Sequence, residues 1–128
     1  MRLVMTALVV PDYDEAIAFF TGPLGFRLLE DKDMGGGKRW VVVGTDGGGS
    51  LLLAKATSAE QQAAIGNQTG GRVGWFVHCH DFAAAHDRLT AAGVAFVEEP
   101  RHEAYGTVAV FEDPYGNRWD LIEPKEAS

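Results

Sequence analysis

The side chains best suited to chemistry lie in the second half of this sequence, at the ends of short apolar segments. They are His78, His80, Glu112, Arg118 and Asp120. A histidine such as His78 can transfer protons near neutral pH. A metal site built from His78, Glu112 and Asp120 is a second hypothesis. The simplest interpretation is a hydrogen-bonded or solvated histidine. The sequence contains no nucleophile-elbow motif and no Walker phosphate loop.

Alternating and helical patterns predict the elements that position these residues. In the first half, Asp12 begins a helix that Pro23 limits to about Thr21. In the second half, Asp81 begins a helix that ends at Gly93. Ser58 and Gln61 predict a short helix between the halves. The predicted strands are residues 3–10, 26–30, 39–43, 50–54, 72–79, 94–98, 107–112 and 118–123, several of them joined by glycine-rich turns.

The two halves repeat the same order of elements. The helix-starting residues Asp12 and Asp81 differ by 81 − 12 = 69 positions, and the helix-ending Gly25 and Gly93 differ by 93 − 25 = 68. A repeat of this kind indicates two βαβββ modules of an α+β protein. We expect one domain over 1–128, with module one at 1–56, a connector at 57–71 and module two at 72–124.

Composition restricts the kinds of partner. The 128 residues include 11 basic and 18 acidic side chains, so the formal charge is −7. This balance argues against nucleic-acid binding and mildly favours a neutral or cationic small ligand. The single Cys79 indicates a reducing compartment, and no apolar stretch is long enough to span a membrane. We therefore expect a cytoplasmic protein that has no membrane partner.

Two segments resemble the vicinal oxygen chelate superfamily, which includes glyoxalase I, bleomycin-resistance proteins and extradiol dioxygenases. The first is Leu8–Asp12 with Phe19, Phe20 and Leu24–Phe26, and the more specific second is Phe111–Leu121, with its Asp-Pro-x-Gly-Asn turn. Further segments resemble an uncharacterised bacterial branch. The resemblance implies a curled mixed sheet around a cleft, helices outside, and a homodimer. Enzymes of the superfamily hold a divalent metal with three or four His, Glu or Gln side chains.

The positions of those ligands fall here on Met5, Gly74 and Asp120. Glycine has no side chain, and a thioether suits soft copper(I) rather than a harder divalent ion. One carboxylate does not make a metal site. We therefore expect no metal and no other cofactor.

Strand alternation predicts which side chains share the cleft with these positions. The predicted ligand-binding residues are Met5, Ala7, Phe76, His78, Val110, Glu112, Arg118 and Asp120. Glu112 and Arg118 flank the last turn symmetrically, which predicts a cross-strand ion pair at the cleft rim or a grip on a polar ligand. Trp40 and Trp119 are expected to anchor the core. His102 and Glu103 are expected in a loop at the cleft mouth.

The leading hypothesis is a protein that binds a small organic ligand in an apolar cleft, without the metal of the superfamily. Drug sequestration of the resistance type would fit the acidic balance. One alternative is a lyase- or isomerase-type enzyme that uses a displaced metal or His78 and Asp120 as acid and base. Another is a non-catalytic interaction module. Whether the protein is an enzyme stays open at this point.

Overall fold

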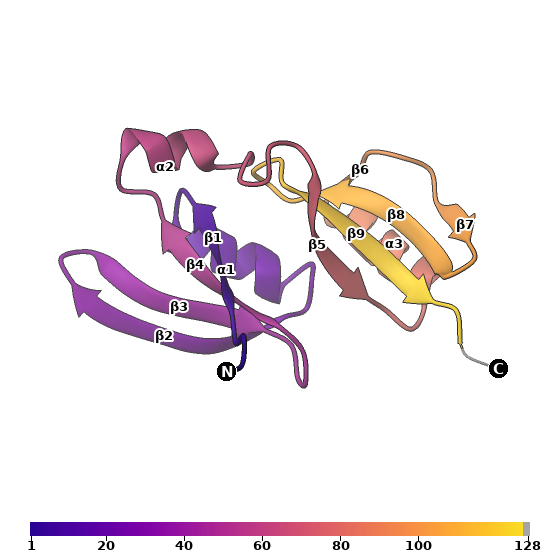
Figure 1. Cartoon of the computed structure of the whole chain (residues 1–128), viewed down its shortest axis with the longest axis horizontal. Helices are drawn as coiled ribbons and strands as arrows, with labels where there is room; N and C mark the ends of the chain where they lie inside the picture. The colour runs from indigo at the N-terminus through magenta and orange to yellow at the C-terminus, as the bar shows by residue number, and fades with distance from the viewer. Residues whose placement is uncertain (127–128) are drawn as a thin grey trace. The chain divides into compact units, whose positions relative to one another are not determined.

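The computed structural model describes residues 1–126 and divides into two compact units, one covering Met1–Ile65 and one beginning at Gly66. Each unit is a mixed sheet with a helix against one face (Figure 1). The protein is therefore a mixed α+β fold with sheets of four and five strands. No helix in the described part of the chain is both long and apolar enough to cross a membrane.

The first unit contains a four-stranded sheet in the order β1-β4-β3-β2. Its elements are β1 (Thr6–Val10), α1 (Tyr13–Thr21), β2 (Arg27–Gly35), β3 (Lys38–Gly44), β4 (Ser50–Lys55) and α2 (Ala59–Ala64). Strand β1 is parallel to β4, and the other neighbours are antiparallel. Leu8 pairs with Leu53, which pairs with Val41. All three are fully buried, as is Phe20 of α1.

The second unit repeats this arrangement, in the order β5-β9-β8-β6, with β7 also paired to β8. Its elements are β5 (Val73–His78), α3 (Phe82–Ala91), β6 (Ala95–Phe96), β7 (Arg101–Glu103), β8 (Gly106–Glu112) and β9 (Arg118–Pro124). Strand β5 is parallel to β9, as β1 is to β4. The shared connection order confirms the internal repeat that the offset of the helix caps predicts.

Both long helices begin as their sequences predict. The side chain of Asp12 accepts a hydrogen bond from the Glu15 backbone N–H at 2.8 Å, and that of Asp81 accepts one from Ala84 at 3.1 Å. These bonds satisfy amide groups that have no partner within the helix. Helix α1 ends at Thr21, two residues before Pro23.

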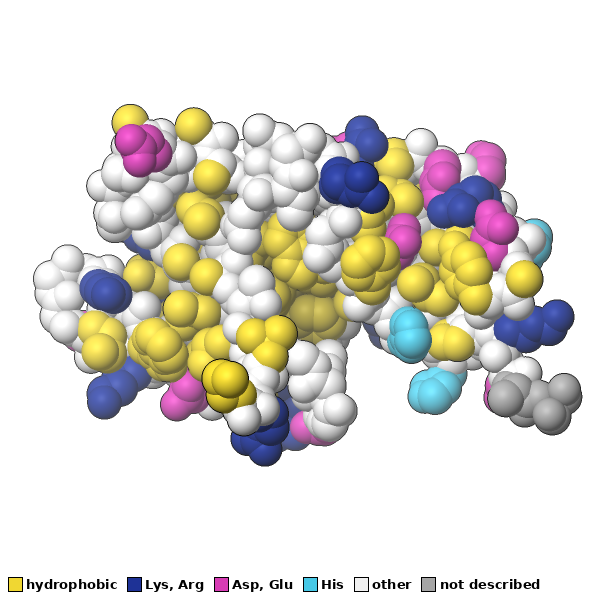
Figure 2. Space-filling model, viewed as in Figure 1, with side chains coloured by type: hydrophobic (Ala, Val, Ile, Leu, Met, Phe, Trp, Pro, Cys, Tyr) yellow, Lys and Arg dark blue, Asp and Glu magenta, His cyan; other side chains and the backbone are white. Residues whose placement is uncertain are grey.

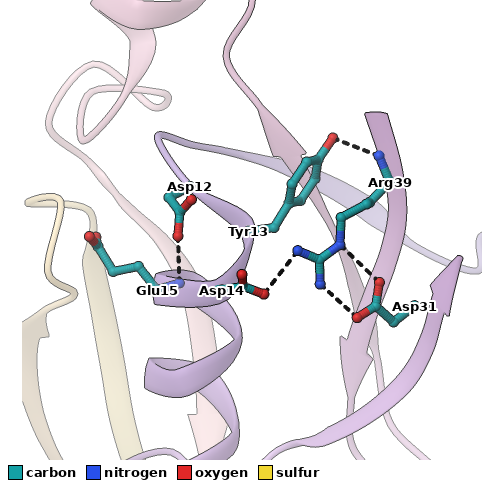
Figure 3. Close-up of polar contacts among 6 residues, drawn as sticks. All are labelled: Asp12, Tyr13, Asp14, Glu15, Asp31 and Arg39. Atoms are coloured by element: carbon teal, nitrogen blue, oxygen red, sulfur yellow. Dashed lines mark hydrogen bonds and ion pairs between the residues drawn. The ribbon is translucent and has the colours of Figure 1, made fainter. Parts of the chain in front are cut away.

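An arginine cluster ties the start of α1 to the β2–β3 hairpin (Figure 3). The Arg39 guanidinium donates to both carboxylate oxygens of Asp31, at 3.1 and 2.7 Å, and to Asp14 at 2.9 Å. The backbone N–H of Arg39 donates to the Tyr13 hydroxyl at 3.1 Å. The Arg39 guanidinium also lowers the pKa of Asp31 below its usual value. The charge of Arg39 is therefore paired with carboxylates of the same unit.

The β8–β9 hairpin is organised by one buried carboxylate. Asp113, only 4% exposed, accepts four hydrogen bonds: from the backbone N–H groups of Tyr115 and Asn117, the Asn117 amide and the Trp119 indole. Its own backbone N–H donates to the Asn117 carbonyl at 3.0 Å. The turn is the one that the Asp-Pro-x-Gly-Asn motif predicts, and Gly116 adopts φ +99° within it. The hydrogen bonds of the buried Asp113 carboxylate therefore fix the connection from β8 to β9.

Several predicted boundaries were wrong. The first strand begins at Thr6 rather than residue 3, so Met5 lies just before β1. Strand β2 runs to Gly35 rather than residue 30, and the hairpin turn after it is made by Gly36 and Gly37, both with positive φ. The strand predicted over 94–98 contains only Ala95–Phe96.

Two further expectations are corrected by the pairing of the strands. His102 and Glu103 were expected in a loop, but they belong to β7, which pairs with β8. Trp40 is half-buried rather than a core anchor, and its indole N–H donates to Glu30 at 3.0 Å. Trp119 is 2% exposed and is the predicted anchor.

Replacing Asp113 with alanine should destabilise the protein by about 3 kcal/mol or more, because it leaves several buried donors without an acceptor. Urea denaturation followed by tryptophan fluorescence measures this change. Asp46→Ala is the matched control, since its carboxylate is 79% exposed and bonds only Arg27 in the described structure. Equal stability of the two variants would contradict the role given to Asp113.

Candidate functional site

Three residues form a row across the second sheet. Phe76 of β5 pairs with Asp120 of β9, and Asp120 pairs with Val110 of β8. Residues paired in this way on neighbouring strands direct their side chains to the same face. The register therefore brings together three of the eight residues predicted to bind a ligand.

The opposite face of the sheet is the core side of this unit. Trp119 stacks on Trp75 at 5.4 Å and on Phe111 at 6.0 Å between ring centroids. The ring contacts continue from Phe111 through Phe96 to His86 of α3. Helix α3 therefore lies on the tryptophan face, and the row of Phe76, Asp120 and Val110 lies on the face away from it. We call this second face the open face.

The open face is apolar with polar groups at intervals. Phe76 is 62% exposed, an unusual state for a large aromatic side chain. Val108 and Ile122 form the next row, beyond Val110 and Asp120. The two valines are buried and Ile122 is half-buried, so the exposed part of this face lies around Phe76. Figure 2 shows hydrophobic side chains gathered over this sheet, with acidic and histidine side chains at their margin. A small molecule could contact the phenyl ring and a carboxylate at the same time.

Asp120 has an unsatisfied carboxylate oxygen. Its Oδ1 is buried and has no hydrogen-bond partner among residues 1–126. Burial raises the pKa of Asp120 above its usual value, the positive charge of Arg101 lowers it, and the negative charge of Glu98 raises it. A buried acceptor without a donor costs free energy, so a ligand donor that reaches Oδ1 through a shift of the side chains covering it would be stabilised there.

The nearby Arg101 is engaged by other carboxylates. Its Nε donates to both Glu98 oxygens, at 3.1 and 3.2 Å, and its Nη1 donates to Glu103 at 2.9 Å. Glu98 also accepts a hydrogen bond from the Val110 backbone N–H at 3.1 Å. This bond fills the gap in the pairing of β8 between β6 and β7. The sequence analysis did not identify Glu98 and Arg101 as site residues. Their only sequence signal is that they have opposite charges three positions apart, on either side of Pro100.

The other predicted residues of the second unit lie at the margin. Glu112 and Arg118 are paired across the hairpin, as predicted, with a distance of 3.9 Å between charged atoms. Both are partly exposed, so this ion pair adds little to stability. His78 is exposed and pairs with Ile122 rather than with Asp120. The strand register thus does not pair His78 with Asp120.

Met5 and Ala7 belong to the first unit. Ala7 lies on β1 between Thr6 and Leu8, on the face opposite the buried Leu8 side chain. Met5 precedes the strand and is half-buried. A single cleft shared by these residues and the open face stays a prediction.

The donor set does not fit the metal that the resemblance implies. Gly74 lies in a β-bulge between Val73 and Trp75. A Cβ at this position would lie 2.6 Å from Thr69 Cγ2, so a histidine there would displace a neighbour. Within the described range, no three His, Cys, Asp or Glu side chains are grouped closely enough to hold a metal ion. Asp120 is left as a single carboxylate.

Comparisons with known proteins agree with this architecture. An uncharacterized protein of Shewanella frigidimarina is 52% identical over 124 residues, covering 94% of this chain and 92% of the relative. The crystal structure of UcmS2 superimposes with a TM-score of 0.81 at 32% identity, covering 96% of this chain and 98% of UcmS2. TnmS3, an antibiotic binding protein from Streptomyces sp. CB03234, gives a TM-score of 0.71 at 29% identity, covering 98% of each chain.

The family comparison covers both units. Residues 2–121 match the family model described as Glyoxalase/Bleomycin resistance protein/Dioxygenase superfamily. This range includes Met5, all of β1 and the part of β9 that carries Asp120, so it contains the expected ligand positions at either end of the chain. The two units with their shared strand order and this match lead to one conclusion: the chain belongs to the Glyoxalase/Bleomycin resistance protein/Dioxygenase superfamily.

Proposed function

We propose that this protein binds a small organic molecule on the open face of its second sheet, without the metal of the superfamily. The ligand packs against Phe76 and donates a hydrogen bond to Oδ1 of Asp120. The single observation that carries this proposal is the buried Asp120 oxygen that has no partner among residues 1–126, on the residue paired with Phe76, whose side chain is 62% exposed.

The two groups supply different parts of the binding free energy. Covering an exposed aromatic ring contributes through apolar area, and Phe76 offers the largest such side chain on the open face. The carboxylate contributes orientation, because a donor must lie within hydrogen-bonding distance of Oδ1. Sites of this kind combine an apolar surface with a few polar groups. The arrangement needs no metal to orient the ligand.

The likeness to TnmS3 supports a role in binding rather than turnover. TnmS3 is described as an antibiotic binding protein, and it covers 98% of this chain. His78 is exposed and lies opposite Ile122, so it is not paired with Asp120 for acid–base transfer. A protein of this superfamily with an apolar face and one poised carboxylate is suited to sequestering a ligand.

Phe76→Ala should weaken binding of a neutral aromatic probe, 2-naphthalenemethanol, by about tenfold, because it removes most of the apolar contact. Titration followed by two-dimensional NMR gives the Kd and shows which amides move. Met34→Ala is the matched control, since Met34 is 51% exposed on β2 of the first unit. Equal affinity of the two variants, or no binding by the wild type, would remove the basis of the proposal.

Protein purified without added metal should contain no stoichiometric divalent ion. Supplying Ni²⁺, Co²⁺, Zn²⁺ or Mn²⁺ should leave the Tm unchanged. A metal ion that bound only the native state would raise the Tm, and we expect no such binding. Elemental analysis and thermal denaturation measure the two quantities. One tightly bound ion per chain, lost in Asp120→Ala, would establish the displaced metal site instead.

A further inference from the structure

We infer that Glu98 and Arg101 determine the charge of the ligand that Asp120 accepts, selecting a protonated amine and rejecting a carboxylate. This inference rests on the proposed function, since it names the ligand class of the same site. Neither residue was among the predicted binding residues. Both lie between β6 and the end of β7, beside the open face.

Arg101 is placed where it could have neutralised Asp120. It pairs with Val108 of β8, which lies on the same face as Val110, the partner of Asp120. An arginine free to turn toward Asp120 would donate to the buried oxygen and leave no unpaired acceptor for a ligand. It would also offer its remaining N–H groups to an anionic ligand.

The two glutamates hold Arg101 away from that role. Both carboxylate oxygens of Glu98 accept hydrogen bonds from Nε of Arg101, and Glu103 accepts one from Nη1. The cluster of Asp120, Glu98, Glu103 and Arg101 carries three negative charges and one positive charge, a net charge of −3 + 1 = −2. The adjacent Glu112–Arg118 pair adds no net charge. A ligand at Asp120 therefore meets a negative field.

The sign of this field decides between ligand classes. A protonated amine supplies the missing donor to Oδ1 and compensates one of the negative charges. A neutral hydroxyl supplies the donor alone. A carboxylate supplies no donor and faces repulsion in a partly desolvated site. The expected order of affinity is amine, then hydroxyl, then carboxylate.

Glu98 is the residue through which this order can be changed. Its Oε1 accepts from the Val110 N–H as well as from Arg101. In Glu98→Gln the amide oxygen can keep the Val110 bond while the negative charge is lost. Arg101 then loses one of its two carboxylate partners and is freer to turn toward Asp120. Glu99→Gln makes the same charge change at an adjacent exposed position and is the matched control.

The experiment uses three probes on the full chain at neutral pH: 2-naphthylmethylammonium, 2-naphthalenemethanol and 2-naphthoate. They share one ring system and differ in the group presented to Asp120. For the wild type we expect the ammonium probe to bind about tenfold more tightly than the carboxylate probe. Glu98→Gln should reduce this ratio several-fold, Glu99→Gln should leave it unchanged, and Asp120→Asn should remove the preference for the ammonium probe.

The outcomes separate the inference from the proposed function. If the neutral probe binds through Phe76 but the wild type does not prefer the ammonium probe, the charge selection is wrong and the binding site stands. A ratio that changes equally in Glu98→Gln and Glu99→Gln would also overturn the role of Glu98. If none of the three probes binds, the proposed function itself fails. Thermal denaturation of each variant shows that it is folded.

Discussion

The arrangement of the open face depends on the buried carboxylate of Asp113. By accepting four hydrogen bonds from Tyr115, Asn117 and Trp119, it fixes where β8 ends and β9 begins. Side chains alternate between faces, so a register slip of one residue would exchange the faces of β9. Trp119 would then leave the core and Asp120 would enter it. The turn thus determines that the tryptophan stacks inside and the aspartate faces away from α3.

Two aspartates seven residues apart show opposite uses of the same side chain. Asp113 is 4% exposed and fully engaged by donors, so it contributes to stability. Asp120 has an oxygen that is buried without a partner in the described part of the chain, so it lowers the stability of the folded protein. Such a cost is typical of sites that acquire their partner on binding. This chain has a carboxylate on its last strand, whereas neither Gly74 nor Met5 has a side chain suited to a divalent metal.

Local chemistry made much of the fold predictable. The Asp12 and Asp81 caps mark the helix starts, and the Asp-Pro-x-Gly-Asn segment marks the last hairpin. Alternation correctly assigned Trp119 to the core and its neighbour Asp120 to the other face. The bulge at Gly74 could not be predicted, because it depends on how β5 pairs with β9 far along the chain. The roles of Glu98 and Arg101 arise from a gap in strand pairing, for which the sequence has no periodic signal.

The most direct measurement is the pKa of the Asp120 carboxyl group, followed by carboxyl-carbon NMR as the pH is varied. Burial without a hydrogen-bond donor disfavours the charged form, so we expect Asp120 to titrate above the usual aspartate value of 3.8. The same shift means that Asp120 reduces the stability of the fold as the pH rises through this range. A pKa at or below 3.8 would show that hydrogen-bond donors or the charge of Arg101 outweigh burial, and would contradict the account of the open face.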